Sequence, residues 1–177
     1  AYIDNWYATN LAGYETYISD TLFCNDRTIL ETIPRGYSNL GYGVELTAYR
    51  WYSVFSGKKL TCQEQNDRFT VNDEVVGNGD LTYPIGLLTR DEGILAGGYI
   101  DKLNRAYYLY TGDMYWTMSP SDFDGRQAYV QEVYSNGSAG SGSYVSNSGV
   151  DVRPVINLKS GSLTKGSGSA SDPWMVD

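Results

Sequence analysis

The chain has 177 residues, 14% of them aromatic, and this length suits one domain that is stable without a metal. A net charge of −8, with no run of Lys or Arg, argues against a nucleic-acid partner, and no apolar run approaches the roughly 20 residues of a membrane span. His is absent, which excludes catalytic triads and metal sites that require it.

The first half of the chain predicts one helix and several extended segments. Apolar residues at helical spacing predict a helix from the start to about Asn10, with Trp6 facing the core. Residues 44–55 are rich in β-branched and aromatic side chains and indicate extended structure. Pro84 interrupts the apolar run 81–88, so we expect an edge strand or an extended segment there.

A capping-box pattern marks a second helix. Thr89 can cap the helix, Glu92 follows three residues later, and apolar residues come behind them. We therefore expect a short helix from Arg90 to about Ala96, ended by the two glycines that follow. Many short strands, few helices and abundant glycine turns together predict an irregular α+β domain.

The last third combines scaffold-like ends with an unusual middle. Residues 115–118 predict an aromatic strand stopped by Ser119 and Pro120, and residues 152–158 alternate in polarity as a strand does. Between them, residues 135–149 hold six Ser, four Gly and two Asn. Tyrosines set among such residues are typical of antibody-like binding loops. The alternative is a solvated glycine-rich connector without a ligand.

The orientation of the aromatic strand decides which side chains reach solvent. We expect Trp116 in the core and Tyr115 facing out. Arg153 could bind an anionic ligand, but we favour a structural role in which its guanidinium closes a loop by bonding backbone carbonyls or a carboxylate.

Residues 128–133 predict a strand that does not keep strict alternation. If Ala128 and Val130 face inward, Tyr129 and Gln131 face the surface beside the preceding turn. The pattern then requires a bulge near residues 131–132 or an early end of the strand. The result would be a mixed polar and aromatic patch.

The two cysteines lie near short Asn-Asp-Arg segments at residues 25–27 and 66–68. Cys24 and Cys62 could pair or could both be buried thiols. The Asn-Asp-Arg segments are explained by turns in which an Asx side chain caps the backbone while Asp and Arg pair. A calcium-binding loop is the alternative, and it would draw on Asp67, Asp73, Asn78 and Asp80.

Several motifs together resemble a known bacterial family. TLFCNDR, LTYPIGLLTRDE, YWTMSP and VRPVINL occur in an order similar to that of domains frequent in gut Firmicutes, related to the C-type lectin-like fold of formylglycine-generating enzymes. The resemblance covers nearly the whole chain and implies a single C-type lectin-like domain over residues 1–177. Cys24 and Cys62 do not resemble the redox-active cysteine pair of those enzymes, so no catalysis is implied.

The same region also resembles the variable region of proteins diversified by retroelements. Such proteins keep a C-type lectin-like scaffold and mutate adenine-rich codons, which implies a variable ligand-binding region at about residues 113–150. The resemblance, with the patch described above, indicates these ligand-binding residues: Tyr115, Ser121, Asp122, Asp124, Arg126, Gln127, Tyr129, Gln131, Tyr134, Tyr144 and Ser146.

These observations lead to a non-catalytic recognition domain without a cofactor, monomeric in isolation, that binds a protein or glycan on another cell or surface. We expect it to be extracellular or on the cell surface, within a longer anchored protein of a bacterium or on a phage particle, and this setting predicts a Cys24–Cys62 disulfide. A packing module of a surface protein or pilus is the alternative. An enzyme comes third, because Asp91 and Glu92 are adjacent on a helix and cannot flank one substrate.

Overall fold

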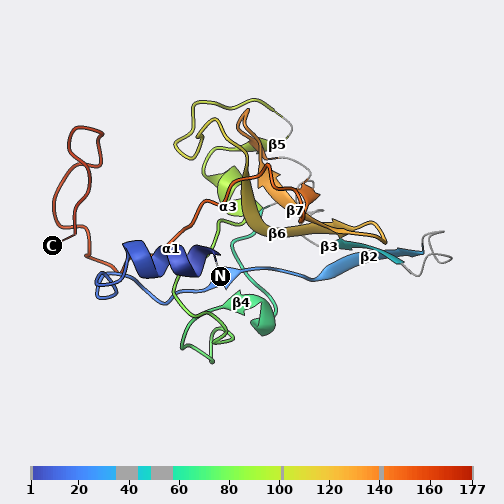
Figure 1. Ribbon diagram of the computed structural model, residues 1–177, viewed down its shortest axis with the longest axis horizontal. Coiled ribbons are helices and arrows are strands. Elements are labelled where there is room, and N and C mark those ends of the chain that lie inside the picture. The colour runs from blue at the N-terminus through green and yellow to red at the C-terminus, as the bar shows by residue number, and fades with distance from the viewer. Residues whose placement is uncertain (1, 35–43, 49–57, 101, 140–141, 177) are drawn as a thin grey trace.

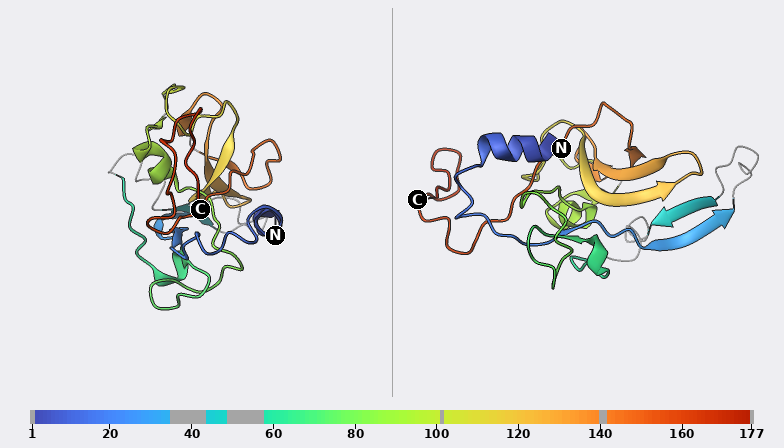
Figure 2. Two further views of the ribbon diagram at one scale, coloured as in Figure 1. Left: turned by 90° about the vertical axis from the view of Figure 1, so that its left-hand side faces the viewer. Right: turned by 60° about the horizontal axis from the view of Figure 1, so that its bottom comes forward.

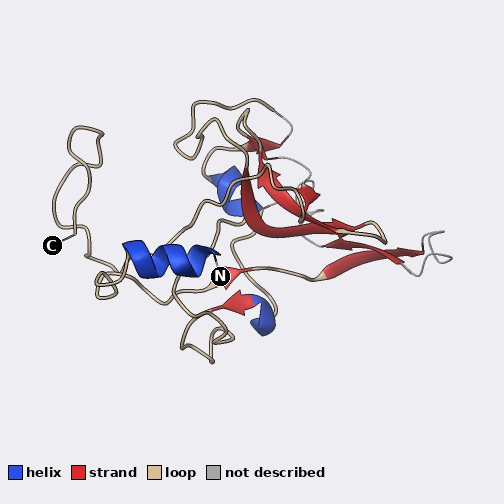
Figure 3. Cartoon of the chain, viewed as in Figure 1, coloured by secondary structure: helices blue, strands red, loops and turns tan. Residues whose placement is uncertain are grey.

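The computed structural model describes residues 2–34, 44–48, 58–100, 102–139 and 142–176. It is an α+β protein, as expected, in which one seven-stranded sheet carries most of the regular structure (Figures 1 and 3). The strands of this sheet are β2 (Ile29–Pro34), β3 (Val44–Ala48), β5 (Tyr99–Ile100), β6 (Tyr115–Phe123), β7 (Ala128–Val133), β8 (Ser138–Ala139) and β9 (Ser143–Tyr144). Their order is β2-β3-β6-β7-β8-β5, and β9 pairs with β7. Every pairing is antiparallel except that of β5 with β8.

Helix α1 (Tyr2–Asn10) confirms the helix predicted at the start of the chain. Its buried side is the stripe of Ile3, Tyr7 and Leu11, spaced four residues apart, and the Tyr7 ring stacks on Tyr83 with 4.8 Å between centroids. Trp6 is 40% exposed, so its predicted place in the core is wrong. Adjacent helical residues are about 100° apart around the axis, so a stripe through Tyr7 turns Trp6 towards solvent.

Helix α3 (Arg90–Leu95) confirms the second predicted helix and its capping box. The Thr89 Oγ1 accepts from the Glu92 amide at 3.2 Å, and the Glu92 carboxylate accepts from the Thr89 amide at 2.6 Å. At the other end, the amides of Gly97 and Gly98 donate to the carbonyls of Ile94 and Gly93, and Gly97 has a φ of +119°. These bonds form a Schellman motif, which requires a left-handed residue.

The disulfide between Cys24 and Cys62 is present, as predicted. Cys24 ends strand β1 (Phe23–Cys24), which pairs with β4 (Arg68–Phe69) in a two-stranded sheet. The short helix η2 (Gln65–Asp67) directly precedes β4. The two Asn-Asp-Arg segments therefore lie side by side. The Arg–Asp pair forms across them, with Arg27 Nε 2.6 Å from the Asp67 carboxylate, and the amide of Asn25 donates to the Asp67 carbonyl.

Strand β6 continues through Pro120 to Phe123, so the predicted stop at Ser119 and Pro120 is wrong. Pro120 lies opposite Val130 of β7, and the register shifts on both sides of it. Proline cannot donate to a strand ladder and is tolerated where a bulge interrupts the bonding. The bulges thus allow a nine-residue strand to contain a proline.

The described part of the interior has two small apolar clusters and many buried polar side chains. One cluster surrounds Tyr7, and the other consists of Tyr107, Tyr115 and Val133. The buried residues of β6 after Tyr115 are polar: Thr117, Ser119 and Ser121 are each at most 2% exposed. The described part of the core is therefore unusually rich in hydrogen-bonding groups.

Residues 152–158 run in an extended conformation but form only isolated bridges, so the predicted strand there is wrong. Val155 exchanges two backbone hydrogen bonds with Gly86, which confirms an extended segment within residues 81–88. A hairpin follows, closed by a bridge between Lys165 and Met175, and it extends away from the rest of the protein (Figures 1 and 2). None of the helices in the described ranges is long and apolar enough to span a membrane.

Candidate recognition surface

The turn between β6 and β7 is held by one carboxylate. Asp124 Oδ1 accepts from the amides of Arg126 and Gln127 at 2.8 and 2.9 Å, and the Asp124 amide donates to the Gln127 carbonyl. Gly125 adopts a φ of +87°, which suits the second residue of this turn. The bond from the Gln127 amide, followed by that from Arg126, keeps the pKa of Asp124 below its usual value. The turn therefore presents an exposed Arg126 on a fixed backbone.

Two tyrosines lie side by side next to this turn. Tyr129 on β7 is the register partner of Tyr144 on β9, and their ring centroids are 4.8 Å apart with a tilt of 59°. The Tyr129 hydroxyl donates to Asp124 Oδ2 at 3.0 Å. Burial and this hydrogen bond raise the pKa of Tyr129 to about 12, so the phenol keeps its proton at neutral pH. Tyr144 is 44% exposed and offers one side of the pair to solvent.

We call this region the tyrosine surface, and its members come from the β6–β7 turn and from β7, β9 and the turn after β9. It brings together six of the eleven predicted ligand-binding residues: Asp124, Arg126, Gln127, Tyr129, Tyr144 and Ser146. Tyr134 follows the opposite end of β7, and Asp122 is half-buried on β6 opposite Thr47 of β3. These two do not belong to the surface.

Tyr115 is a core residue, and the prediction that it faces out is wrong. It is 3% exposed, its hydroxyl donates to the Leu109 carbonyl at 3.3 Å, and the Arg153 guanidinium lies 5.2 Å from its ring centroid. Arg153 also donates to the Leu109 carbonyl, which confirms that it closes a loop. Trp116 is only half-buried, because the alternation of β6 gives the inward position to Tyr115.

Ser121 and Gln131 are also buried, at 1% and 0% exposure, so neither can contact a ligand as predicted. Ser121 takes an inward position in the alternation of β6. Trp116 pairs with Glu132 and Pro120 pairs with Val130, so β6 has three residues between these pairs where β7 has only Gln131. The predicted bulge is therefore at the expected place, but its extra residues belong to β6. The irregularity leaves both Gln131 and Glu132 inside.

The sequence did not reveal how β9 is attached to β7. Ser143 Oγ donates to Glu132 Oε1 at 2.8 Å, and this carboxylate is fully buried. Gly142 has a φ of +106°, and a Cβ there would lie 2.7 Å from the Val130 carbonyl oxygen, so only glycine fits. These contacts position Tyr144. No local signal identifies them, because they depend on the pairing of β7 with β9.

Three of the four side chains considered for calcium instead cap turns or pair with a cation. Asp67 accepts from the backbone and side chain of Arg27, and Asp73 Oδ1 accepts from the amides of Val75 and Val76. Asn78 Oδ1 accepts from the amide of Asp80. Within the described ranges, no group of three or more His, Cys, Asp or Glu side chains could hold a metal ion.

The geometry of the tyrosine surface is that of a fixed contact area. A hydrogen-bonded turn and a paired hairpin hold an aromatic pair and an exposed guanidinium on one sheet. Such an area can supply aromatic contact and adaptable hydrogen bonds. Comparisons with protein-family models, curated proteins and solved structures find no match to this chain.

Proposed function

We propose that this chain is a non-catalytic recognition domain of C-type lectin-like fold that binds a protein or glycan through the tyrosine surface. The observation that carries the proposal is the pairing of Tyr129 with Tyr144 beside Arg126, because these side chains are held outside the core by contacts of their own. Tyrosine has few rotatable bonds and therefore gives contact area at a low entropy cost.

The hydrogen-bonded turn between β6 and β7 favours a rigid binding surface over a flexible loop. Asp124 bonds two backbone amides and the Tyr129 hydroxyl, so the unbound surface already has much of its bound geometry. Preorganisation of this kind increases affinity because less freedom is lost on binding. The resemblance to diversified proteins implies a variable region at about residues 113–150, and this range includes the tyrosine surface.

The setting we propose is outside the cell, within a surface-displayed protein. The Cys24–Cys62 disulfide supports it, because such bonds persist in oxidising compartments. The net charge of −8 favours solubility and disfavours acidic polymers as ligands.

The test is binding to glycan and protein arrays by the wild type, Tyr144→Ala and a matched control, Tyr108→Ala. Tyr108 is a 79% exposed tyrosine outside the tyrosine surface. We expect binding to particular array members that Tyr144→Ala reduces at least tenfold, while Tyr108→Ala retains it and both variants melt as the wild type does. Equal binding by all three proteins would contradict the proposal.

A further inference from the structure

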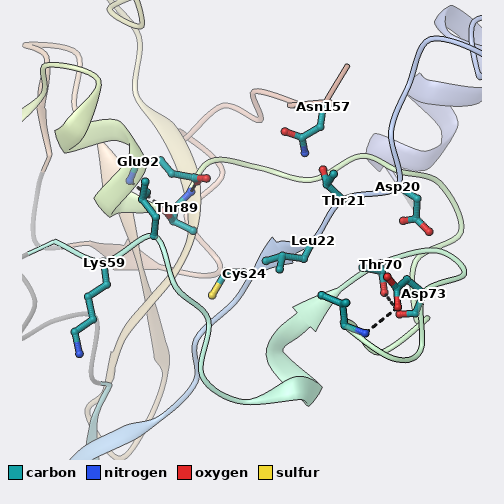
Figure 4. A pocket seen from close by; sticks show the side chains of 12 residues that line it. Asp20, Thr21, Leu22, Cys24, Lys59, Thr70, Asp73, Thr89, Glu92 and Asn157 are labelled. Carbon is teal, nitrogen blue, oxygen red and sulfur yellow. Dashed lines mark hydrogen bonds between the residues drawn. The ribbon is translucent and has the colours of Figure 1, made fainter. Parts of the chain in front are cut away.

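A cavity of about 480 Å³ lies among residues that take no part in the tyrosine surface (Figure 4). Its volume is that of a typical small-molecule site. The lining comes from five parts of the chain: residues 20–24, which end in β1, residues 59–60, the loop after β4, the N-terminus of α3, and the C-terminal segment at Asn157. No sequence motif identifies it, because these parts are far apart in the chain.

Two of its carboxylates are held in place by backbone amides. Asp20 accepts from the amides of Val71 and Asn72 at 2.7 and 2.8 Å. Asp73 Oδ1 accepts from two amides of its own loop. An ionised carboxylate can accept about four hydrogen bonds, so both keep capacity for a ligand. Glu92 uses its Oε2 to cap α3 and supplies a third carboxylate.

The charge of the lining selects a cation. Among the described lining residues there are three acids, Asp20, Asp73 and Glu92, and one basic residue, Lys59. Figure 4 shows the Lys59 ammonium directed away from the other labelled side chains. Anions would be repelled by this cavity. The described lining contains no aromatic ring, so it offers no stacking surface for a flat or methylated cation.

The arrangement of the carboxylates indicates the shape of the ligand. Figure 4 shows Asp20 and Asp73 together on one side, Glu92 on the other, and Leu22 and Cys24 between them. We propose that the cavity binds a short aliphatic diamine, with one ammonium between Asp20 and Asp73, the other at Glu92, and the methylene chain along Leu22 and the disulfide. The site is separate from the proposed recognition function.

The test is isothermal titration and amide NMR of the intact chain with 1,4-diaminobutane, compared with butylamine and 1,4-butanediol. We expect the diamine to bind at least tenfold more tightly than the monoamine, since each lost charged contact is worth about tenfold or more. The diol should not bind. Amide shifts should be confined to residues 20–24, 70–76 and 89–92. Comparable binding of all three ligands, no binding of the diamine, or shifts spread over the acidic surface would overturn the proposal.

Two variants test whether the second ammonium of the diamine binds at Glu92. Glu92→Gln retains a capping acceptor but removes the charge, so we expect diamine affinity to fall about tenfold to the monoamine level while the fold persists. Glu64→Gln, an exposed acid outside the cavity that makes no side-chain cap bond, is the control and should bind as the wild type does. Equal loss in both variants, or none in Glu92→Gln, would show that the carboxylate does not hold the ligand.

Discussion

Tyr115 and Tyr144 lie in the same sheet, and the sequence predicts a ligand contact for both, yet their environments are opposite. Tyr115 is 3% exposed and bonded to the Leu109 carbonyl, whereas Tyr144 is 44% exposed and lies against Tyr129. Met114 and Trp116 flank Tyr115, and Ser143 and Val145 flank Tyr144, but these neighbours do not determine which way either ring points. The difference shows that a tyrosine contributes to recognition here only where strand pairing turns it away from the core.

The largest effect should come from exchanging these two tyrosines for alanine. Tyr115→Ala removes a buried ring and leaves a cavity, which costs about 3–5 kcal/mol. Tyr144→Ala removes an exposed ring and should change the free energy of unfolding by no more than about 0.5 kcal/mol. Urea denaturation of both variants measures the contrast. Similar losses would mean that the two regions are not distinct.

Removing the disulfide tests whether the tyrosine surface depends on a distant part of the scaffold. The bond joins residues separated by 38 positions, and its loss in a Cys24→Ser, Cys62→Ser variant should cost about 2–4 kcal/mol. The Tyr129 and Tyr144 ring signals in NMR should not shift while the protein remains folded. Shifted ring signals in the folded variant would show that the surface depends on the disulfide.

Gln131 lies on β7, as Tyr129 does, but its side chain points into the interior. Its side chain is fully buried, and among the residues that the structure describes neither its amide nitrogen nor its oxygen has a hydrogen-bond partner. An unsatisfied buried polar group costs about 1–3 kcal/mol, so Gln131→Met should stabilise the protein by a similar amount. Gln127→Met, in the turn of the tyrosine surface, is the control and should change stability little. A destabilised Gln131→Met variant would indicate that the amide has a bound partner in solution.

The smallest effect concerns pH. The pKa of Tyr129 is raised to about 12 by burial and by Asp124, above the usual value of about 10. The folded state therefore holds this proton more tightly, and the stabilisation is complete below pH ~10 and is lost as the pH rises towards 12. Tyr129→Phe should flatten this part of the stability profile, and Asp124→Asn should do so partly. An unchanged profile in Tyr129→Phe would contradict the assignment.

Local signals predicted the helices and turns well. The capping box at Thr89 and Glu92 and the glycines after Leu95 act within a few residues, so the pattern alone specifies α3. The disulfide was predicted from the expected environment of the protein, and its geometry required the structure. The tyrosine surface was predicted in part, because Asp124 and its turn are contiguous in sequence.

The failures in β6 and β7 depend on pairing between strands. Alternation divides β6 into two faces but does not say which face is inward, so the sequence predicts the wrong face for Tyr115 and Ser121. Pro120 remains within β6 because bulges opposite β7 accommodate it. Gln131 is buried by the same register shift. A single sequence contains no local record of these contacts.

The most direct test of the account is hydrogen–deuterium exchange with a ligand identified on the arrays. If the tyrosine surface binds it, amides of residues 124–129 and 143–146 should become protected, and those of α1 and the disulfide region should exchange as before. Protection confined to α1 or to the C-terminal hairpin, with the tyrosine surface unchanged, would contradict the account.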